Sequence, residues 1–480
     1  MSPPAISVPD AETAGPEEED APPKPPVPAR EAAALLALRD ANPSSELPEI
    51  WTAGSDPSQW PGLKTAADGA VVELVLDGRA LAAVPAAVGD LSRLEKLWLS
   101  NNGIRTIDAG ISKLQRLESL WLGSNLLRTA SLPPSLSALT GLKQLWLPSN
   151  HLVELPEAVC DLPALEWLDV SENKLTTLPA AIGRRAPSLT RLDAHSNALA
   201  AVPPELGRLS ALRHLSLHFN ELEALPGEIG GCTSLVWMTV HANRLREVPP
   251  EMGRLTNLSR LSLHMLEITT LPPELGGMSQ MEAFAAFKCR LTSLPGAALA
   301  GWRVCRRLAL YENQIAEVPE EIGEMEGLEE LWLYDNRLTS LPKAIGRLGR
   351  LQRLWLDRNL LETLPAEIGG CGKLQELYVS ENRLKTLPTE LTALTGLRRL
   401  YLAGNPDLVI PPQVAAMPCL SGGREYGGGG GGGPGGGGPG GGGGGPRGAA
   451  APAGGGVSAL AAAVEAFKLE PARREEQGGA

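Results

Sequence analysis

Four of the chain's six histidines recur at one place in a repeated phrase, at intervals of about 23 residues: His195, His218, His241 and His264. Imidazoles in a regular row can ligate a metal ion, respond to pH or contact a partner. The plain alternative is duplication of a repeat that carries a solvated histidine. A row with about 5 Å between side chains does not converge on one ion as tetrahedral zinc ligands must, so we expect no metal and no cofactor.

Nucleophilic catalysis is a second chemistry that these residue types allow. Ser216, His218 and Asp193 would be near neighbours on adjacent strands, which suggests a serine-hydrolase triad. The sequence has no GxSxG elbow, and an open face would not exclude water from the reaction. Phosphate-binding and kinase signatures are also missing from the sequence. We therefore predict that the protein is not an enzyme.

A phrase of the form LxxLxLxxNxLxxLPxxIGxL must position these side chains, and it repeats from about residue 71 to about residue 411. Such a short fixed period indicates a solenoid in which each repeat contacts chiefly its neighbours. The LxLxx part predicts a short strand that stacks in parallel on the next one, and the asparagine can bond backbone groups where the chain turns. The asparagine slot marks fifteen repeats, at Arg79, Asn102, Asn125, Asn150, Asn173, Asn197, Asn220, Asn243, Leu266, Cys289, Asn313, Asn336, Asn359, Asn382 and Asn405.

The phrase LWLYDNRLTSLPKAIGRLGRLQRL (331–354) resembles the leucine-rich repeat family, and its LPxxIGxL half resembles the intracellular Ras-group class. The resemblance implies an α/β fold: a curved horseshoe with parallel strands on the concave face and short helical or irregular segments on the convex face. It also implies protein binding in signalling. Two successive repeats depart from the phrase, with Leu266 and Cys289 in the asparagine slot. The departure indicates either tolerated drift or a local hinge near residues 265–305.

The outward-pointing strand positions carry the candidate site. Seven of the ten tryptophans fall there, and clustered aromatic residues of this kind dominate protein interfaces. The alternative is that stacked rings only stabilise the sheet, at about 0.2–1 kcal/mol per cross-strand pair. We predict a partner-binding surface, exposed to solvent, made of Trp98, Trp121, Trp146, Trp167, Asp169, Arg191, Asp193, His195, His214, His218, Trp237, His241, Arg260, His264, Phe287, Tyr311, Trp332, Tyr334, Trp355, Tyr378 and Tyr401.

Composition and local pattern divide the chain into five parts. We expect a disordered proline-rich acidic tail (1–29), an N-terminal capping segment (30–70), the solenoid with its C-terminal cap (71–420), a flexible glycine-rich linker (421–456) and a short helix with a tail (457–480). A net charge of −12 disfavours nucleic acid, and the absence of a long apolar run predicts no integral membrane association. The six scattered cysteines and the lack of a signal peptide favour a cytoplasmic monomer.

The sequence thus predicts a non-catalytic protein-binding scaffold or regulator, in intracellular signalling, that binds a protein on its concave face. The alternative is a ligand, metal or pH sensor centred on the histidine row.

Overall fold

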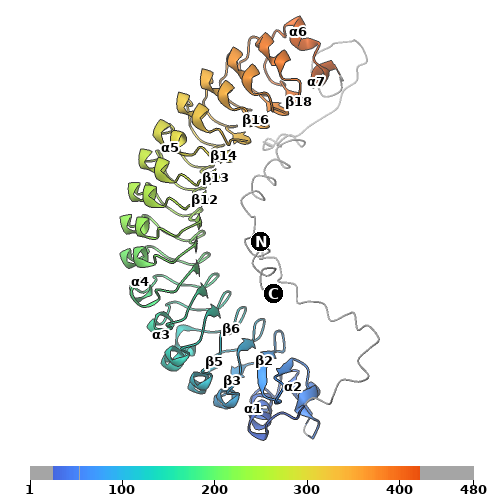
Figure 1. Ribbon diagram of the computed structural model, residues 1–480, viewed down its shortest axis with the longest axis vertical. Helices are drawn as coiled ribbons and strands as arrows, with labels where there is room; N and C mark the ends of the chain where they lie inside the picture. The colour runs from blue at the N-terminus through green and yellow to red at the C-terminus, as the bar shows by residue number, and fades with distance from the viewer. Residues whose placement is uncertain (1–24, 53, 422–480) are drawn as a thin grey trace, which may run out of the picture.

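The computed structural model describes residues 25–52 and 54–421. The tail before residue 25, the glycine-rich linker and the C-terminal helix expected from the sequence lie outside the described residues. The described part is a curved solenoid whose strands line the concave side and whose helical turns line the convex side (Figure 1). The predicted leucine-rich repeat solenoid is therefore confirmed.

One continuous sheet forms the concave side of the solenoid. Its first strand, β1 (Leu63–Thr65), pairs antiparallel with β2, and every later pair is parallel and in register. Because each repeat adds one strand, the fifteen parallel strands match the fifteen repeats of the sequence. These strands are β2 (Val71–Val75), β4 (Lys96–Trp98), β6 (Ser119–Trp121), β7 (Gln144–Trp146), β8 (Trp167–Asp169), β9 (Arg191–Asp193), β10 (His214–Ser216), β11 (Trp237–Thr239), β12 (Arg260–Ser262), β13 (Ala283–Ala285), β14 (Arg307–Ala309), β15 (Glu330–Trp332), β16 (Arg353–Trp355), β17 (Glu376–Tyr378) and β18 (Arg399–Tyr401).

Single helical turns, most of them 3₁₀, form the convex layer. In a regular repeat the proline of the LP pair stands in extended conformation before the turn, and an i+3 bond such as Leu206 N to Pro203 O closes it. The turns are η2 (Ala86–Asp90), η3 (Ala109–Lys113), η4 (Thr129–Ser131), η5 (Pro134–Ala138), α3 (Glu157–Cys160), α4 (Ala181–Arg185), η6 (Pro204–Arg208), η7 (Gly227–Gly231), η8 (Pro250–Arg254), η9 (Pro273–Gly277), α5 (Gly296–Gly301), η10 (Glu320–Glu324), η11 (Lys343–Arg347), η12 (Ala366–Gly370) and η13 (Thr389–Ala393). A small parallel pair, β3 (Ala83–Val84) and β5 (Thr106–Ile107), lies beside the early turns.

Both ends of the described solenoid carry extra elements. At the N-terminal end, α1 (Ala29–Asp40), α2 (Leu47–Ile50) and η1 (Pro57–Gln59) precede β1, and Trp51 and Trp60 stack there at 5.2 Å and are buried. At the C-terminal end, α6 (Pro412–Ala415) and α7 (Pro418–Ser421) follow the last strand, with Val414 buried. These elements cover apolar side chains that have no further repeat to pack against.

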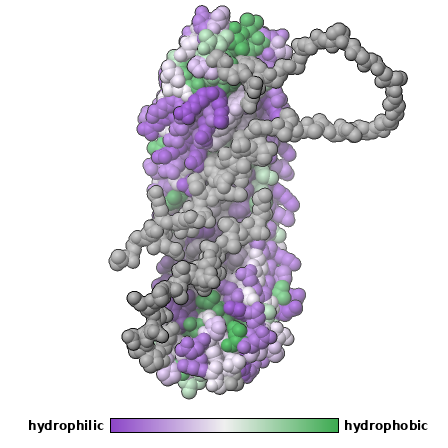
Figure 2. Space-filling model, turned by 90° about the vertical axis from the view of Figure 1, so that its right-hand side faces the viewer, coloured by the Kyte–Doolittle hydropathy of each residue, from purple (hydrophilic) through white to green (hydrophobic). Residues whose placement is uncertain are grey.

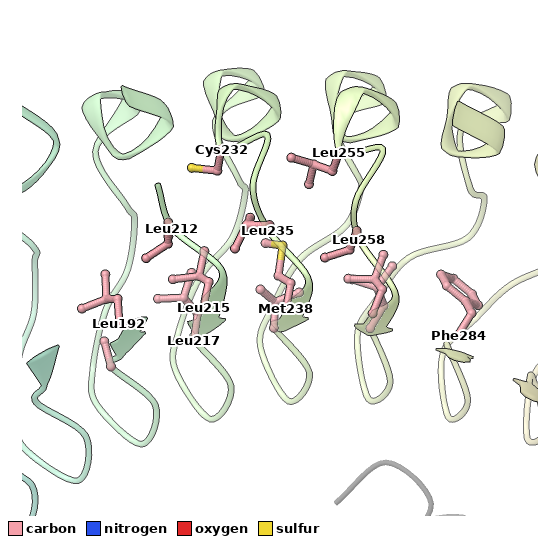
Figure 3. Packing of buried hydrophobic residues seen from close by; sticks show 14 of the residues in the cluster. Leu192, Leu212, Leu215, Leu217, Cys232, Leu235, Met238, Leu255, Leu258 and Phe284 are labelled. Atoms are coloured by element: carbon pink, nitrogen blue, oxygen red, sulfur yellow. The ribbon is translucent and has the colours of Figure 1, made fainter. Parts of the chain in front are cut away.

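The core is a single leucine-rich column between the two layers (Figure 3). Each repeat contributes the inward leucines of its strand, such as Leu215 and Leu217, and side chains from the turn, such as Cys232 and Leu255. Inward and outward side chains alternate along each strand, so the histidines and tryptophans of the candidate site lie on the opposite face.

A buried asparagine turns the chain after most strands. Asn243 donates through Nδ2 to the carbonyls of Leu217 at 3.0 Å and Val240 at 2.8 Å, and its Oδ1 accepts from Leu222 N at 2.9 Å. The carbonyl of Leu217 and the N–H of Leu222 belong to the preceding repeat. Each such asparagine therefore connects its own repeat to the backbone of the one before it. The predicted bonding of the asparagine to backbone groups is present with this geometry in regular repeats from Asn102 to Asn405.

The two irregular repeats do not interrupt the sheet. β12, β13 and β14 pair in register across them, and Cys289 Sγ donates to the carbonyl of Leu263 at 3.3 Å. The buried rings of Phe284 and Trp302 pack together at 4.6 Å, and Trp302 Nε1 donates to Leu275 O. Large rings thus fill the core where the regular phrase is lost. No described helix is long and apolar enough to cross a membrane.

Candidate partner-binding surface

Three columns of side chains run across the concave face, because the parallel strands are in register. We call the first residue of each three-residue strand the first column, the last residue the second column, and the residue two positions further the third column. On β12 these are Arg260, Ser262 and His264. All twenty-one residues predicted for the site lie in these columns.

Seven rings of the third column form one uninterrupted stack. The four histidines continue into Phe287, Tyr311 and Tyr334, with centroid separations between 3.9 and 4.5 Å and interplanar angles of 10–16°. The four histidines are therefore the first four members of a continuous stack of rings, which we call the seven-ring stack.

Two further stacks lie in the second column. Trp98, Trp121 and Trp146 stack at 3.7 and 4.5 Å, and Trp167 of the first column meets Trp146 edge-on. In the late repeats Trp332, Trp355, Tyr378 and Tyr401 form a second series, with centroids 4.5–5.5 Å apart. Offset-stacked or edge-to-face pairs of Phe, Tyr and Trp rings contribute about 0.5–1.5 kcal/mol each beyond their burial, so contacts of this kind stiffen the sheet.

In most repeats a large side chain in one of the second and third columns accompanies a smaller one in the other; Trp332 and Tyr334 of the same repeat are an exception. Beside the early tryptophans the third column has Ser100, Gly123 and Pro148, whereas beside the seven-ring stack the second column has Ser216, Thr239 and Ser262. Ala285 and Ala309 take that place beside Phe287 and Tyr311. The small neighbouring side chains leave room for the rings, and part of the surface of each ring is buried.

This packing corrects the expectation that all predicted site residues are exposed. Ala285, Phe287, Ala309, Tyr311, Trp332 and Trp355 form a second hydrophobic cluster, separate from the leucine core. The side chains that are buried rather than exposed are Trp121, Asp193, Phe287, Tyr311, Trp332 and Trp355. The remaining fifteen predicted residues are half-buried and keep part of their surface accessible. They are Trp98, Trp146, Trp167, Asp169, Arg191, His195, His214, His218, Trp237, His241, Arg260, His264, Tyr334, Tyr378 and Tyr401.

The histidines of the seven-ring stack are held neutral. Burial, followed by the charge of neighbouring imidazoles, lowers the pKa of His218 and of His241 to about 2 and that of His264 to about 3. Second-column hydroxyls fix the rings: Ser216 Oγ and Thr239 Oγ1 lie 3.0 and 3.1 Å from His218 Nδ1. Within the described residues, no group of three or more His, Cys, Asp or Glu side chains is placed to hold a metal ion.

The residues of the considered triad do not form a catalytic relay. Asp193 accepts from Arg191 Nε at 2.6 Å and from Trp167 Nε1 at 3.3 Å, and the Arg191 guanidinium lies over the Trp167 ring at 4.2 Å. The carboxylate is thus bonded to an arginine and an indole, while His218 bonds hydroxyls. Burial and the neighbouring Asp193 carboxylate raise the pKa of Asp169, which accepts from Ser171.

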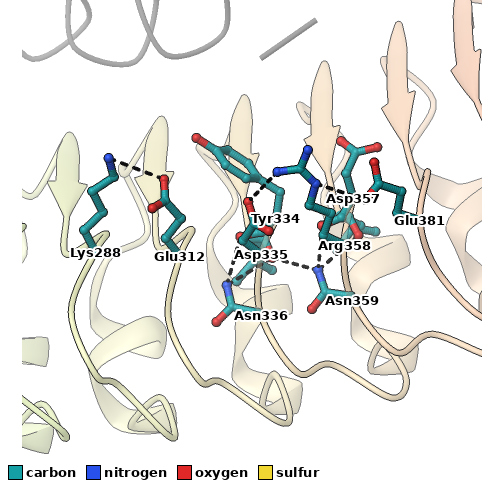
Figure 4. Close-up of polar contacts among 11 residues, drawn as sticks. Lys288, Glu312, Tyr334, Asp335, Asn336, Asp357, Arg358, Asn359 and Glu381 are labelled. Atoms are coloured by element: carbon teal, nitrogen blue, oxygen red, sulfur yellow. Dashed lines mark hydrogen bonds and ion pairs between the residues drawn. The ribbon is translucent and has the colours of Figure 1, made fainter. Parts of the chain in front are cut away.

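The rim beside the third column is formed by the residue that precedes each asparagine. In the late repeats this rim is charged: Lys288 lies 3.6 Å from Glu312, and Arg358 joins Asp335 at 3.4 Å and Glu381 at 3.1 Å (Figure 4). Seen from the concave side, polar residues dominate the coloured margins of the molecule (Figure 2).

Phe219 and Met265 are exposed exceptions that the sequence analysis missed. The sequence feature that identifies them is an apolar residue at a position that is polar in most other repeats.

Leucine-rich repeat models match three stretches of the chain. A two-copy model matches residues 92–135, a second model matches 140–199 and 187–245, and a leucine-rich repeat region model matches 303–407. A solved leucine-rich repeat protein of Leptospira interrogans is 32% identical, covers 71% of this chain and 91% of its own, and superposes with a TM-score of 0.58. The chain belongs to the leucine-rich repeat family.

Two further proteins are similar to this leucine-rich repeat protein, one over most of the chain and one over a short stretch. The crystal structure of PEPR1–AtPEP1 is 28% identical, with 80% of this chain and 56% of that chain covered and a TM-score of 0.68. A leucine-rich repeat and calponin homology domain-containing protein of Drosophila melanogaster is 44% identical over 86 residues. That match spans 18% of this chain and 10% of the Drosophila protein. The leucine-rich repeat fold is generally a non-catalytic scaffold for protein interactions.

Proposed function

We propose that this protein is a non-catalytic scaffold or regulator of intracellular signalling that binds a protein partner on its concave face. The observation that carries the proposal is the run of three ring stacks across successive repeats, with partly accessible rings in each. Tryptophan, tyrosine and arginine dominate interface hot spots. Because neighbouring rings already hold these side chains in place, they lose little conformational entropy when a partner docks.

The chemistry of the histidines supports binding rather than catalysis. A general base acts best with a pKa near the working pH, whereas the pKa of His218 is lowered to about 2. With pKa values lowered in this way, the histidines do not change charge near neutral pH, as the residues of a physiological pH sensor must. The rings stack face to face, so they do not surround a common point where a metal ion would sit. No observation favours the sensor alternative.

The cysteines support an intracellular, cytoplasmic location. All six are free, and five of them are buried single thiols of the repeats. Burial raises the pKa of Cys232 and of Cys371 to about 12, which keeps these thiols protonated and unreactive. Such thiols suit a reducing compartment. We propose a monomer there, with no nucleic-acid partner.

Affinity capture from native cell extract tests the proposal. Trp121 and Trp355 are buried, so replacing them would disturb the fold; the half-buried Trp146 and Tyr401 are better targets. A Trp146→Ser, Tyr401→Ser double variant loses ring contacts and should melt at a lower temperature, so capture is compared at a temperature where circular dichroism shows it folded. Under that condition we expect it to lose a captured protein by about tenfold or more. Val304→Ser, at a side chain 44% exposed and outside the concave columns, is the control. Equal capture by all three proteins would contradict the proposal.

A further inference from the structure

One edge of the seven-ring stack is apolar and open to solvent. Phe219, Ala242 and Met265 occupy the rim position of three successive repeats, and we call these three residues the apolar rim. The Phe219 and Met265 side chains are 53% and 47% exposed. The Phe219 ring lies edge-on to the rings of His218 and His241, with its centroid 5.5 Å from each. The apolar rim therefore continues the surface of the histidine rings.

The backbone makes these residues unusual at this position. The rim position has a positive φ in every repeat, and in the apolar rim the values are 52°, 53° and 57°. Bulky side chains are disfavoured at such φ values, and exposed apolar ones gain nothing from burial. In the other repeats the position holds glycine or a polar or charged residue. Exposed apolar surface at a conformationally costly position favours a docking role.

The surroundings of the apolar rim favour an uncharged, apolar occupant. The neighbouring rim residue on one side is Ser196, and on the other side it is Lys288, which lies 3.6 Å from Glu312. The imidazoles beside the rim are held neutral by burial. The other exposed large apolar side chains of the described residues occupy different positions of their repeats; they are Val153, Val304 and Val409.

The sequence contains an apolar segment of matching character. In VSALAAAVEAFKLE (457–470) Leu460, Val464 and Phe467 are spaced i, i+4 and i+7, which predicts one apolar face of a short helix. The segment lies outside the described residues. A helix of this length is marginal in water and gains most of its stability by packing its apolar face on another surface.

The spacing along this predicted face matches the apolar rim. Phe219 and Met265 follow β10 and β12, two strand spacings apart, which is about 9.6 Å. Leu460 and Phe467 are seven residues apart, which on a helix is about 10.5 Å. The valine between them then faces Ala242, the smallest side chain of the rim. A helix along the solenoid axis can therefore contact all three rim residues.

The chain between the last repeat and this segment is long enough to reach the rim. α7 contacts β18, so the chain leaves the last repeat beside the concave sheet (Figure 1). From β18 to β10 there are eight strand spacings, or about 38 Å. Residues 422–456 are mostly glycine and, at about 3.3 Å each, can span up to about 115 Å. A tether of this kind gives the segment an effective concentration on the order of 1 mM.

We infer that residues 457–470 dock as a helix on the apolar rim of the same chain, with their apolar face against the exposed Phe219 and Met265 side chains. The docked segment covers part of the concave face, where the proposed protein partner binds. The segment and the partner therefore exclude one another, and this regulatory consequence rests on the proposed function.

Oxidation of Met265 by hydrogen peroxide measures whether the rim is covered. Peroxide converts an accessible methionine to its sulfoxide, which mass spectrometry detects residue by residue. Among the described residues Met265 is the one exposed methionine, and the buried ones are Met238, Met252, Met278, Met281, Met325 and Met417. These buried methionines report any unfolding of a variant in the same sample.

We expect Met265 to be protected in the full-length chain. Leu460→Ser with Phe467→Ser should speed its oxidation about fivefold, since at about 1 mM a segment with a Kd of about 0.2 mM is docked most of the time. Phe219→Ser should release the segment from the other side of the contact. Leu469→Ser is the matched control, because nine residues from Leu460 place it on the opposite side of the predicted helix.

Equal oxidation of Met265 in the native chain and the double variant would overturn the inference, as would an equal effect of Leu469→Ser. Protection that grows with protein concentration would overturn it in favour of a second copy. Protection that needs added cell extract would overturn it in favour of a separate partner.

The two proposals fail separately, because the oxidation test needs no partner. If Trp146→Ser with Tyr401→Ser abolishes capture but Met265 is unprotected, only the docking inference is wrong. If Met265 is protected but capture never depends on the concave face, only the proposed function is wrong. When both hold, Leu460→Ser with Phe467→Ser also captures more of the partner.

Discussion

At the scale of single residues, the seven-ring stack explains why histidines can recur in a row without being charged. Each imidazole has a neighbouring ring on its face, and second-column hydroxyls occupy Nδ1 of His218 and His264. Protonating one ring would place a charge between neutral rings and away from water, which is the cause of the lowered pKa values. A half-exposed surface of neutral hydrogen-bonding groups results.

The lowered histidine pKa values predict loss of stability in acid. In the unfolded chain a histidine takes up a proton as pH falls below about 6.5, whereas in the folded chain His218, His241 and His264 stay neutral to about pH 3. The unfolded state then binds more protons, so the free energy of unfolding falls with pH from about 6.5 downward. We expect the melting temperature to drop from pH 7 to pH 4.5, and to drop less in the His218→Gln, His241→Gln, His264→Gln variant.

Carboxyl groups with raised pKa values, such as those of Asp357 and Asp169, act in the opposite direction, and the comparison removes their effect. Burial raises the pKa of Asp357 to about 6 and also raises that of Asp169, so these groups add stability as pH falls. Both are present in the native chain and in the triple variant, and the difference between the two melting curves isolates the histidines. Parallel curves would refute the assignment of neutral, half-buried imidazoles.

At the scale of elements, the asparagine turn holds each repeat to the one before it. Replacing Asn243 by alanine leaves Leu222 N and Val240 O without their side-chain partners, while Leu217 O keeps its bond from Asn220 Nδ2. A buried polar group left unsatisfied costs about 1–3 kcal/mol, so we expect denaturant unfolding to show a loss of about 2–4 kcal/mol. Asn257→Ala is the matched control, because Asn257 makes a single exposed bond to Thr233 O. A similar loss in both variants would contradict this role of the turn.

The convex turns pack so closely that one methyl group cannot be added. A Cβ on Gly207 would lie 1.9 Å from the carbonyl oxygen of Glu228 in the next turn, η7. That atom is backbone, so a whole turn must move, and we expect Gly207→Ala to destabilise the chain by about 1–3 kcal/mol in denaturant unfolding. Gly349 has no atom within 4 Å of an added Cβ and serves as the control. An equally stable Gly207→Ala variant would show that the turns can slide apart.

At the scale of the whole molecule, the solenoid is held by contacts between neighbouring repeats, and its ends need covers. The N-terminal cover places Trp51, fully buried, against Trp60, with Trp51 Nε1 donating to Pro61 O at 3.2 Å. A repeat array opens from its weakest end because each repeat contacts only its neighbours. Loss of the cover should therefore act locally and not on the whole sheet.

Hydrogen exchange measures this locality. Replacing the buried Trp51 by alanine removes about 3–5 kcal/mol of packing at the N-terminal end. We expect the amides of β2 and β4 to exchange faster, while those of β15 and β16 keep their protection. Uniform acceleration along the chain would mean that the solenoid unfolds as one cooperative unit.

The solenoid itself was predictable because its determinants are local and repeated. Leucine spacing defines strand and core, the asparagine slot defines the turn, and fifteen copies make the register unambiguous. The placement of all predicted site residues in three concave columns follows from the same period. The expected exposure of Trp121, Tyr311 and Trp332 was wrong, since burial depends on which side chain stands in the adjacent column of the neighbouring strands.

The sequence by itself determined the repeat, the number of parallel repeat strands and the face on which each of their side chains lies, because alternation along a strand needs no long-range information. Only the tertiary structure decided that the histidines join Phe287, Tyr311 and Tyr334 in one stack, that their rings are neutral, and that Phe219 and Met265 are exposed. These properties arise between repeats. Ring contact, desolvation and exposure are set by side chains about 23 residues apart in sequence and about 4–5 Å apart in space.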